Sequence, residues 1–167
     1  MQKSKKSNVS IKKEKENQSK TKAGVNENNM KEKLGNNIKG KIIFGRSDTA
    51  KLKSANISVD GYFEYNKKLY LVEIDSENQA KLLAGQYILI DCLYDTSNNE
   101  VTKKYSLDKV VFLVLHCHKD YKPIRTIKNL EVIKDKCKCK LEYQVFHTDD
   151  FKDFDELKNL ISPPHAQ

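Results

Sequence analysis

The chain has 167 residues, which is the length of about one domain. Lys and Arg total 31 against 23 Asp and Glu, so the net charge is +8, and the apolar fraction of 38% lies below the usual range of about 45–50%. No apolar run is long enough for a transmembrane helix, no apolar stretch follows the basic start as in a signal peptide, and four cysteines are too few for a disulfide scaffold. We therefore expect a soluble, cytoplasmic protein with reduced thiols and no membrane contact.

The positive charge is concentrated at the N-terminus. Residues 1–41 contain 12 Lys and 4 Glu, whereas residues 42–167 contain 19 basic and 19 acidic residues. The first segment has almost no large apolar side chain before Met30, so it cannot bury enough surface to offset the entropy of ordering. We predict a disordered Lys/Asn-rich tail over residues 1–30 and one folded domain over residues 31–167. The tail is either a basic arm that contacts nucleic-acid phosphates or a solvated tail without a specific partner.

Hydrophobic periodicity predicts the elements of the domain. Apolar residues alternate along two segments joined by a short turn, which is typical of a hairpin, and then recur at a spacing of three to four, which is typical of a helix. In chain order we predict a weak helix over 30–38, a short strand or helix end at 42–44, strands over 57–65 and 69–75, a helix over 79–94, a strand within 109–118, a helix from just after Pro123, a strand over 141–146 and a helix over 151–161. This order predicts an α/β fold with a mixed sheet and helices on both faces.

Three acidic residues interrupt the apolar hairpin. Glu73 and Asp75 are two apart on the second strand, so they project to the same side, and Asp60 interrupts the first strand in the same way. If the turn is Asn66-Lys67, Asp60 falls opposite Glu73, and if it is Lys67-Lys68, Asp60 falls opposite Asp75. A three-residue loop would separate Asp60 from both acids.

Carboxylates this close repel one another, so each raises its pKa, finds a cation or stays solvated. A hard divalent cation such as Mg²⁺, or Mn²⁺, resolves the conflict by accepting carboxylate oxygens, and it can activate water and neutralise charge on a phosphate. The alternative is that the three acids lie at a strand end facing solvent. We predict a metal site formed by Asp60, Glu73 and Asp75.

These residues carry a resemblance to a known family. Asp60, followed after twelve residues by Glu73-Ile74-Asp75 at the end of an apolar strand and then by a helix, resembles the PD-(D/E)XK nuclease superfamily. The resemblance covers roughly residues 30–148 and implies the restriction-endonuclease-like core, in which a helix, a three-stranded antiparallel meander, a helix and a further strand follow one another.

The resemblance also implies roles for individual residues. Asp60 and Glu73 would be metal ligands, whereas Asp75 stands where the family usually has Lys. Some members carry the Lys on the following helix, where Lys81 is the candidate, and some use a helix Gln near the site, where Gln86 is the candidate for substrate binding. Arg46, before the hairpin, is a candidate phosphate contact or a surface charge in a turn.

The implied function is Mg²⁺-dependent endonucleolytic hydrolysis of phosphodiester bonds in nucleic acid, expected to be DNA, and a homodimer is left open. Asp60, Glu73, Asp75 and Lys81 are the expected catalytic residues. The alternative is an inactive relative that only binds nucleic acid or protein.

A weaker alternative is a zinc-stabilised adaptor, because His116-Cys117-His118 and Cys137-Lys138-Cys139 supply zinc-ligand residue types. Their spacing matches no sharp zinc template. If the strands that carry them are parallel, the two groups lie at opposite ends of the sheet. His116 or His118 is also a candidate general base.

Overall fold

The computed structural model describes residues 25–45, 56–77, 79–97 and 99–162. Residues 25–34 form a first helix, which runs into a short 3₁₀ turn. The elements that follow are β1 (Ile42–Phe44), β2 (Ile57–Val59), β3 (Gly61–Tyr65), β4 (Lys68–Asp75), α2 (Ala80–Leu93), β5 (Val110–His116), α3 (Ile124–Cys137), β6 (Glu142–His147) and α4 (Phe154–Ile161).

The sheet is mixed, as the sequence predicts. Four strands lie in the order β3-β4-β5-β6, with β3 antiparallel to β4 and with β4, β5 and β6 parallel to one another. β1 and β2 form a separate antiparallel pair that lies beside the larger sheet. The carboxyl ends of the three parallel strands therefore lie at the same end of the sheet, which is the usual position of ligand-binding sites in open α/β sheets.

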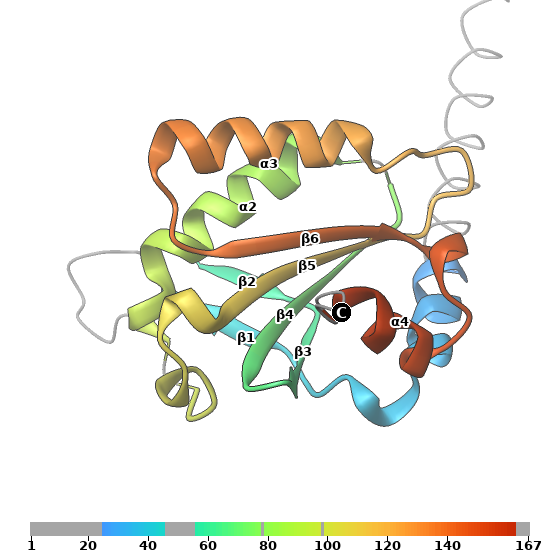
Figure 1. Ribbon diagram of the computed structural model, residues 1–167, viewed down its shortest axis with the longest axis horizontal. Helices are drawn as coiled ribbons and strands as arrows, with labels where there is room; N and C mark the ends of the chain where they lie inside the picture. Colours follow the sequence, from blue (N-terminus) through green and yellow to red (C-terminus); the bar gives the residue numbers. More distant parts are fainter. Residues whose placement is uncertain (1–24, 46–55, 78, 98, 163–167) are drawn as a thin grey trace, which may run out of the picture.

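Helices cover both faces of the sheet (Figure 1). On one face α2 and α3 pack over an apolar layer built around Tyr87 and Phe112. On the other face the first helix and α4 pack over a second layer, which contains Met30, Leu34 and Leu157. β5 supplies side chains to both layers and is buried along its whole length, which explains its unbroken apolar sequence.

The turn between β3 and β4 sets the hairpin register. Asn66 and Lys67 both have positive φ, 48° and 61°, as a two-residue type I′ turn requires. Tyr65 then pairs with Lys68 and Gly61 with Val72, which is the first of the two predicted registers.

The predicted strand over 57–65 is divided in two. The chain bends at Asp60, so β2 pairs with β1 while β3 pairs with β4. Gly61 follows the bend, and a Cβ built there would lie 2.3 Å from Ile38 Cγ2 and 2.7 Å from the Lys39 carbonyl oxygen. The segment before β1 thus crosses so close to β3 that only glycine fits at position 61.

Two helices differ from the prediction by three or more residues at a boundary. The first helix ends at residue 34 rather than 38, and it includes residues 25–29, which the sequence assigned to the tail. The last helix begins at Phe154 rather than Phe151, because Asp153 caps its first turn by accepting a hydrogen bond from the Glu156 N–H. The predicted disorder of residues 1–24 lies outside the described residues. Among the residues that are described, no helix is both long and apolar enough to cross a membrane.

Candidate functional site

The carboxyl end of β4 carries the two acidic residues that the sequence singled out. Leu69 and Leu71 face α2 and α3, so the alternation of the strand brings Glu73 and Asp75 to the same face. Both line a hollow of about 110 Å³ between the end of β4 and the first turns of α2, which we call the Glu73 hollow. Its walls include Gln79, Leu82, Leu83 and Gln86.

Glu73 is held in an environment that disfavours its charge. Burial raises the pKa of its carboxyl to about 8, the charge of Asp60 adds to the shift, and hydrogen bonds from the Gln86 side chain and the Asp60 backbone only partly offset it. The Oε2 atom is buried and has no hydrogen-bond partner. A buried carboxylate oxygen without a partner is costly, so this atom needs a proton or a cation.

Asp60 lies at the bend between β2 and β3. Its Oδ2 accepts a hydrogen bond of 2.9 Å from the Ile74 N–H, so the side chain replaces the backbone hydrogen bond that the bend removes. Asp60 is exposed and lines a second hollow of about 260 Å³, together with Ile74 and residues of the first helix. Ile74 lines both hollows, although the Glu73 hollow lies on the α2 side of β4 and the second hollow lies under the first helix. Asp60 acts on Glu73 through its backbone and its charge.

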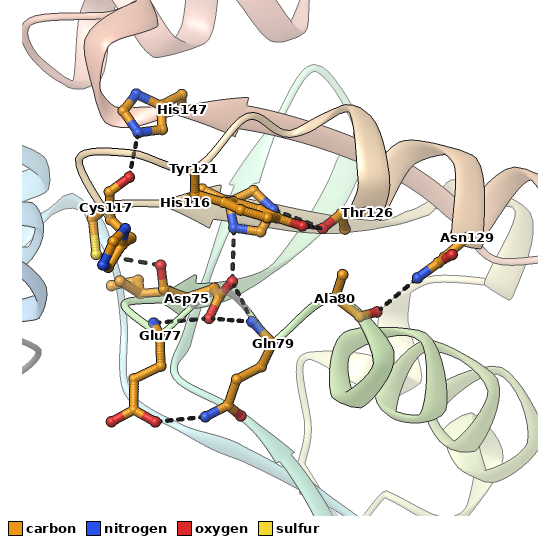
Figure 2. A network of polar contacts seen from close by, with 12 residues as sticks. Asp75, Glu77, Gln79, Ala80, His116, Cys117, Tyr121, Thr126, Asn129 and His147 are labelled. Atoms are coloured by element: carbon orange, nitrogen blue, oxygen red, sulfur yellow. Dashed lines mark hydrogen bonds and ion pairs between the residues drawn. The ribbon is translucent and has the colours of Figure 1, made fainter. Parts of the chain in front are cut away.

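Asp75 is engaged by a buried network at the ends of the parallel strands (Figure 2). His116 is its direct partner in β5, and His116 Nδ1 lies 2.8 Å from Asp75 Oδ2. The contact has the distance of an ion pair, although its angle falls outside hydrogen-bond geometry. His116 is fully buried, so its ring contacts the Asp75 carboxylate away from solvent.

The other side of the His116 ring continues the network. His116 Nε2 lies 2.9 Å from Thr126 Oγ1, and the Tyr121 hydroxyl lies 2.8 Å from the same oxygen. A carboxylate only accepts, so we assign the ring proton to Nδ1. Thr126 then donates to Nε2 and accepts from Tyr121, while the Nδ1 proton lies beside the Asp75 carboxylate.

Asp75 also holds the turn that leads into α2. Its carboxylate accepts from the Glu77 N–H at 3.2 Å and from the Gln79 N–H at 3.1 Å. Burial alone would raise the pKa of Asp75, but His116 and these N–H donors outweigh it, so the pKa lies below its usual value. Asp75 is therefore a charged residue whose oxygens are already partnered, in contrast to Glu73.

The remaining predicted residues are distributed around the site. Gln86 is buried on α2, where its Nε2 donates to the Ser58 carbonyl oxygen at 2.9 Å, and it also contacts Glu73. Lys81 is exposed on α2 and does not line the Glu73 hollow, because the lining positions 79, 82, 83 and 86 share one helix face and 81 lies on nearly the opposite side of the helix. Arg46 lies outside the described residues.

The Cys and His groups do not meet. His116 ends β5, whereas Cys137 and Cys139 lie between α3 and β6, near the opposite end of this parallel pair. Among the described residues, no group of three or more His, Cys, Asp or Glu side chains is arranged to hold a metal ion. His118 and His147 contact each other through the His118 carbonyl oxygen, 3.0 Å from His147 Nε2.

The partnership of Asp75 with His116 was missed by reasoning from the sequence. Its signal is present, since each residue is the polar end of an apolar strand, and adjacent parallel strands bring such ends together. What the sequence lacks is the register that pairs these two positions.

No family model matches the chain, no curated protein matches it and no solved structure matches it, so the geometry described above is the basis on which a function is assigned.

Proposed function

We propose that the chain is a divalent-cation-dependent nuclease of the PD-(D/E)XK type, which hydrolyses phosphodiester bonds in nucleic acid, with DNA as the expected substrate. The observation that carries the proposal is the buried, unpartnered Glu73 Oε2 atom beside Asp60, at a bend between two strands. A pKa of about 8 marks Glu73 as a group whose environment favours a bound proton or cation.

The order of the elements supports the proposal. The first helix is followed by β1, the interrupted strand β2–β3 and β4, which pair antiparallel in succession, and then by α2 and β5. This is the succession of helix, meander, helix and strand that the resemblance implies. Fold-level likeness is an analogy, so the argument for activity depends on the site itself.

The residues present fit a hard cation with two carboxylate ligands. Glu73 offers an unpartnered oxygen, and the exposed Asp60 adjoins it. Carboxylate oxygens and waters are the ligands that Mg²⁺ and Mn²⁺ prefer. When bound, such a cation supplies Lewis-acid stabilisation of the charge that develops on a phosphate.

The neighbouring side chains position these ligands. Gln86 is tied to the Ser58 carbonyl oxygen and contacts Glu73, so it fixes the Glu73 carboxylate against β2. Asp75, whose oxygens are taken by His116 and two N–H groups, fixes the turn that follows Glu73. We therefore propose Asp60 and Glu73 as cation ligands and Asp75 as a positioning residue, and Lys81 stays a prediction.

A second candidate function is cation-dependent binding of nucleic acid without hydrolysis. It is favoured by the lining of the Glu73 hollow, which includes no Lys or Arg among the described residues. Cationic side chains add to the stabilisation that a metal gives to the charge of the transition state. A site that holds the cation but has no such side chain would bind nucleic acid without cleaving it.

Cleavage assays distinguish the two candidates. The full chain is incubated with single-stranded and duplex DNA and RNA in Mg²⁺, Mn²⁺ or EDTA. We expect cation-dependent cleavage that Glu73→Gln and Asp60→Asn reduce by 100-fold or more and that Asp91→Asn retains. Asp91 is a matched control because it is a half-buried carboxylate on α2 that only accepts from the Leu141 N–H. A cation-dependent rise in melting temperature without cleavage would support the second candidate, and neither effect would contradict both.

A further inference from the structure

We propose that the second hollow, which we call the Asp60 hollow, binds one nucleoside of a single-stranded nucleic acid while Lys31 and Lys39 contact the flanking phosphates. The inference rests on the proposed function, because Asp60 lines this hollow and is also one of the two proposed cation ligands. It goes further by assigning a binding subsite and the type of strand that enters it.

The size and lining of the Asp60 hollow fit a nucleoside. Its volume of about 260 Å³ is just below the range of roughly 300–1,000 Å³ typical of drug-sized ligands. The floor is apolar, since Leu34 and Ile74 are buried and Ile38 is half-buried. An apolar floor below a polar rim accepts the flat face of a base and leaves the sugar and phosphate at the rim.

The rim carries the charges that phosphates require. Lys31 and Lys39 both line the hollow, and their side chains are 53% and 54% exposed. Lys31 pairs with Glu27 at 2.6 Å and Lys39 with Glu64 at 3.1 Å. Exposed ion pairs are worth about 1 kcal/mol or less, so each lysine can exchange its carboxylate for a phosphate at small cost.

The shape of the site selects a single strand. A base can enter a hollow of this size only when it is unpaired and unstacked, and in a duplex that step costs a few kcal/mol. Asp60 also lines the hollow, and its negative charge repels a phosphate unless a cation neutralises it. Binding of a strand here should therefore be stronger when a divalent cation is present.

The test measures binding of a fluorescent single-stranded DNA of about 12 nucleotides to the full chain, by anisotropy, with Ca²⁺ present and over a range of salt concentrations. We expect Lys31→Ala with Lys39→Ala to weaken binding tenfold or more and to reduce the slope of log K against log[salt] by about 1.4, that is about 0.7 for each phosphate neutralised. Lys103→Ala is the matched control, because Lys103 is 56% exposed and pairs with Glu100 at 2.6 Å. We expect this control to bind like the wild type.

The position of the base is tested by photocrosslinking of the same strand carrying one 5-iodouracil. We expect crosslinks to map to residues 31–40 and to disappear when a duplex is used. Wild-type affinity in the double lysine variant, crosslinks confined to other segments, or equal affinity for the duplex would overturn the inference.

The proposed function is separated from this inference by a second measurement on the same variants. The rise in melting temperature caused by Mn²⁺ should be the same in the double lysine variant and the wild type, because neither lysine is a cation ligand. If that rise is present while the lysines are without effect on binding, only the inference fails. If the rise is absent while lysine-dependent binding remains, the cation site fails and the nucleoside subsite stands.

Discussion

Glu73 and Asp75 lie two residues apart on one face of β4, but they meet opposite electrostatic environments. Asp75 has His116 and two backbone N–H groups, and its pKa is lowered. Glu73 has a buried oxygen without a partner, and burial raises its pKa to about 8. Two neighbouring carboxyls with divergent pKa values are typical of functional sites. A buried acid without a compensating partner destabilises a packed core, so packing does not explain it.

The first prediction concerns the pH dependence of stability at Glu73. Its pKa is about 8 in the folded state against an ordinary value of 4.5, so the folded state retains a proton that the unfolded state releases. Without a cation, stability therefore falls as the pH rises from about 4.5 to about 8. Gln cannot ionise, so we expect Glu73→Gln to melt several degrees above the wild type at pH 9 and with a much smaller difference at pH 5. A difference that is the same at both pH values would refute the raised pKa.

The second prediction concerns the contact between the Asp75 carboxylate and the His116 ring. His116→Leu leaves a buried charged carboxylate without its partner, so we expect a loss of about 3 kcal/mol in the free energy of unfolding. Adding Asp75→Asn should recover part of this loss, since the charge is then gone. Urea unfolding of the two single variants and the double variant forms a cycle that isolates the pair.

Tyr121→Phe is the control for this cycle. Tyr121 donates only to Thr126, at the far end of the network, so removing its hydroxyl should cost about 1 kcal/mol. Additive effects of His116→Leu and Asp75→Asn would contradict a direct interaction between the two side chains.

At the scale of elements, the bend at Asp60 frees this side chain to line the Asp60 hollow while the Asp60 backbone stays at Glu73. The crossing segment at Ile38 and Lys39 approaches β3 so closely that a side chain at Gly61 has no space. The strand therefore leaves β4 at Asp60 and pairs with β1, and the Asp60 carboxylate takes over the free Ile74 N–H. A continuous strand would leave Asp60 as an ordinary cross-strand neighbour of Glu73.

The third prediction compares two glycines. A Cβ at Gly61 meets the Lys39 carbonyl oxygen at 2.7 Å, whereas a Cβ at Gly85, exposed on α2, meets nothing within 4 Å. We expect Gly61→Ala to reduce the free energy of unfolding by about 2 kcal/mol and Gly85→Ala to increase it by about 0.5–1 kcal/mol. Urea unfolding measures both, and equal effects of the two changes would contradict the close crossing.

The local patterns of the sequence predict most elements but not the bend. Alternation predicts the hairpin and the strand over 69–75, and the spacing of Leu83, Tyr87 and Ile90 predicts α2, because each of these patterns is set by one buried face. The sequence leaves two hairpin registers open. The positive φ values of Asn66 and Lys67 in the structure show which one the turn selects. The bend depends on Ile38 approaching Gly61 from more than 20 residues away, and no local pattern encodes a contact between such distant residues.

At the scale of the whole molecule, the net positive charge is separated in the sequence from the residues that the structure describes. The described body is close to neutral in sequence, while residues 1–24 contain 8 Lys and 2 Glu and precede the helix that lines the Asp60 hollow. Affinity for nucleic acid would then have two sources, a salt-sensitive contribution from the N-terminal lysines and a local one at the two hollows.

The fourth prediction follows from this separation. We expect a chain that lacks residues 1–24 to bind single-stranded DNA with a smaller salt slope, reduced by about 0.7 for every phosphate that these lysines neutralise in the full chain. The shortened chain should keep its cation-dependent rise in melting temperature. Anisotropy titrations between low and high salt measure the slope. If the slope of log K against log[salt] is unchanged, the N-terminal lysines have no role in binding.

The arrangement of the parallel strands explains why the site was only partly predictable. Asp60, Glu73 and Asp75 were identified from charges that interrupt apolar strands, and Glu73 and Asp75 do share a face and a hollow. The role of His116 depends on the register between β4 and β5, which the apolar pattern of neither strand specifies. Sequence patterns identify polar strand ends, and only the assembled sheet pairs them.

Isothermal titration of the full chain with Mn²⁺ at pH 7, in two buffers of different ionisation enthalpy, measures whether Glu73 and Asp60 bind a divalent cation. Because the pKa of Glu73 is about 8, its carboxyl is mostly protonated at pH 7, and binding should displace that proton. We expect saturable binding with the release of close to one proton per cation, abolished in Glu73→Gln and retained in Asp91→Asn. Absence of saturable binding, or the same proton release in Glu73→Gln as in the wild type, would contradict a cation site at these two residues.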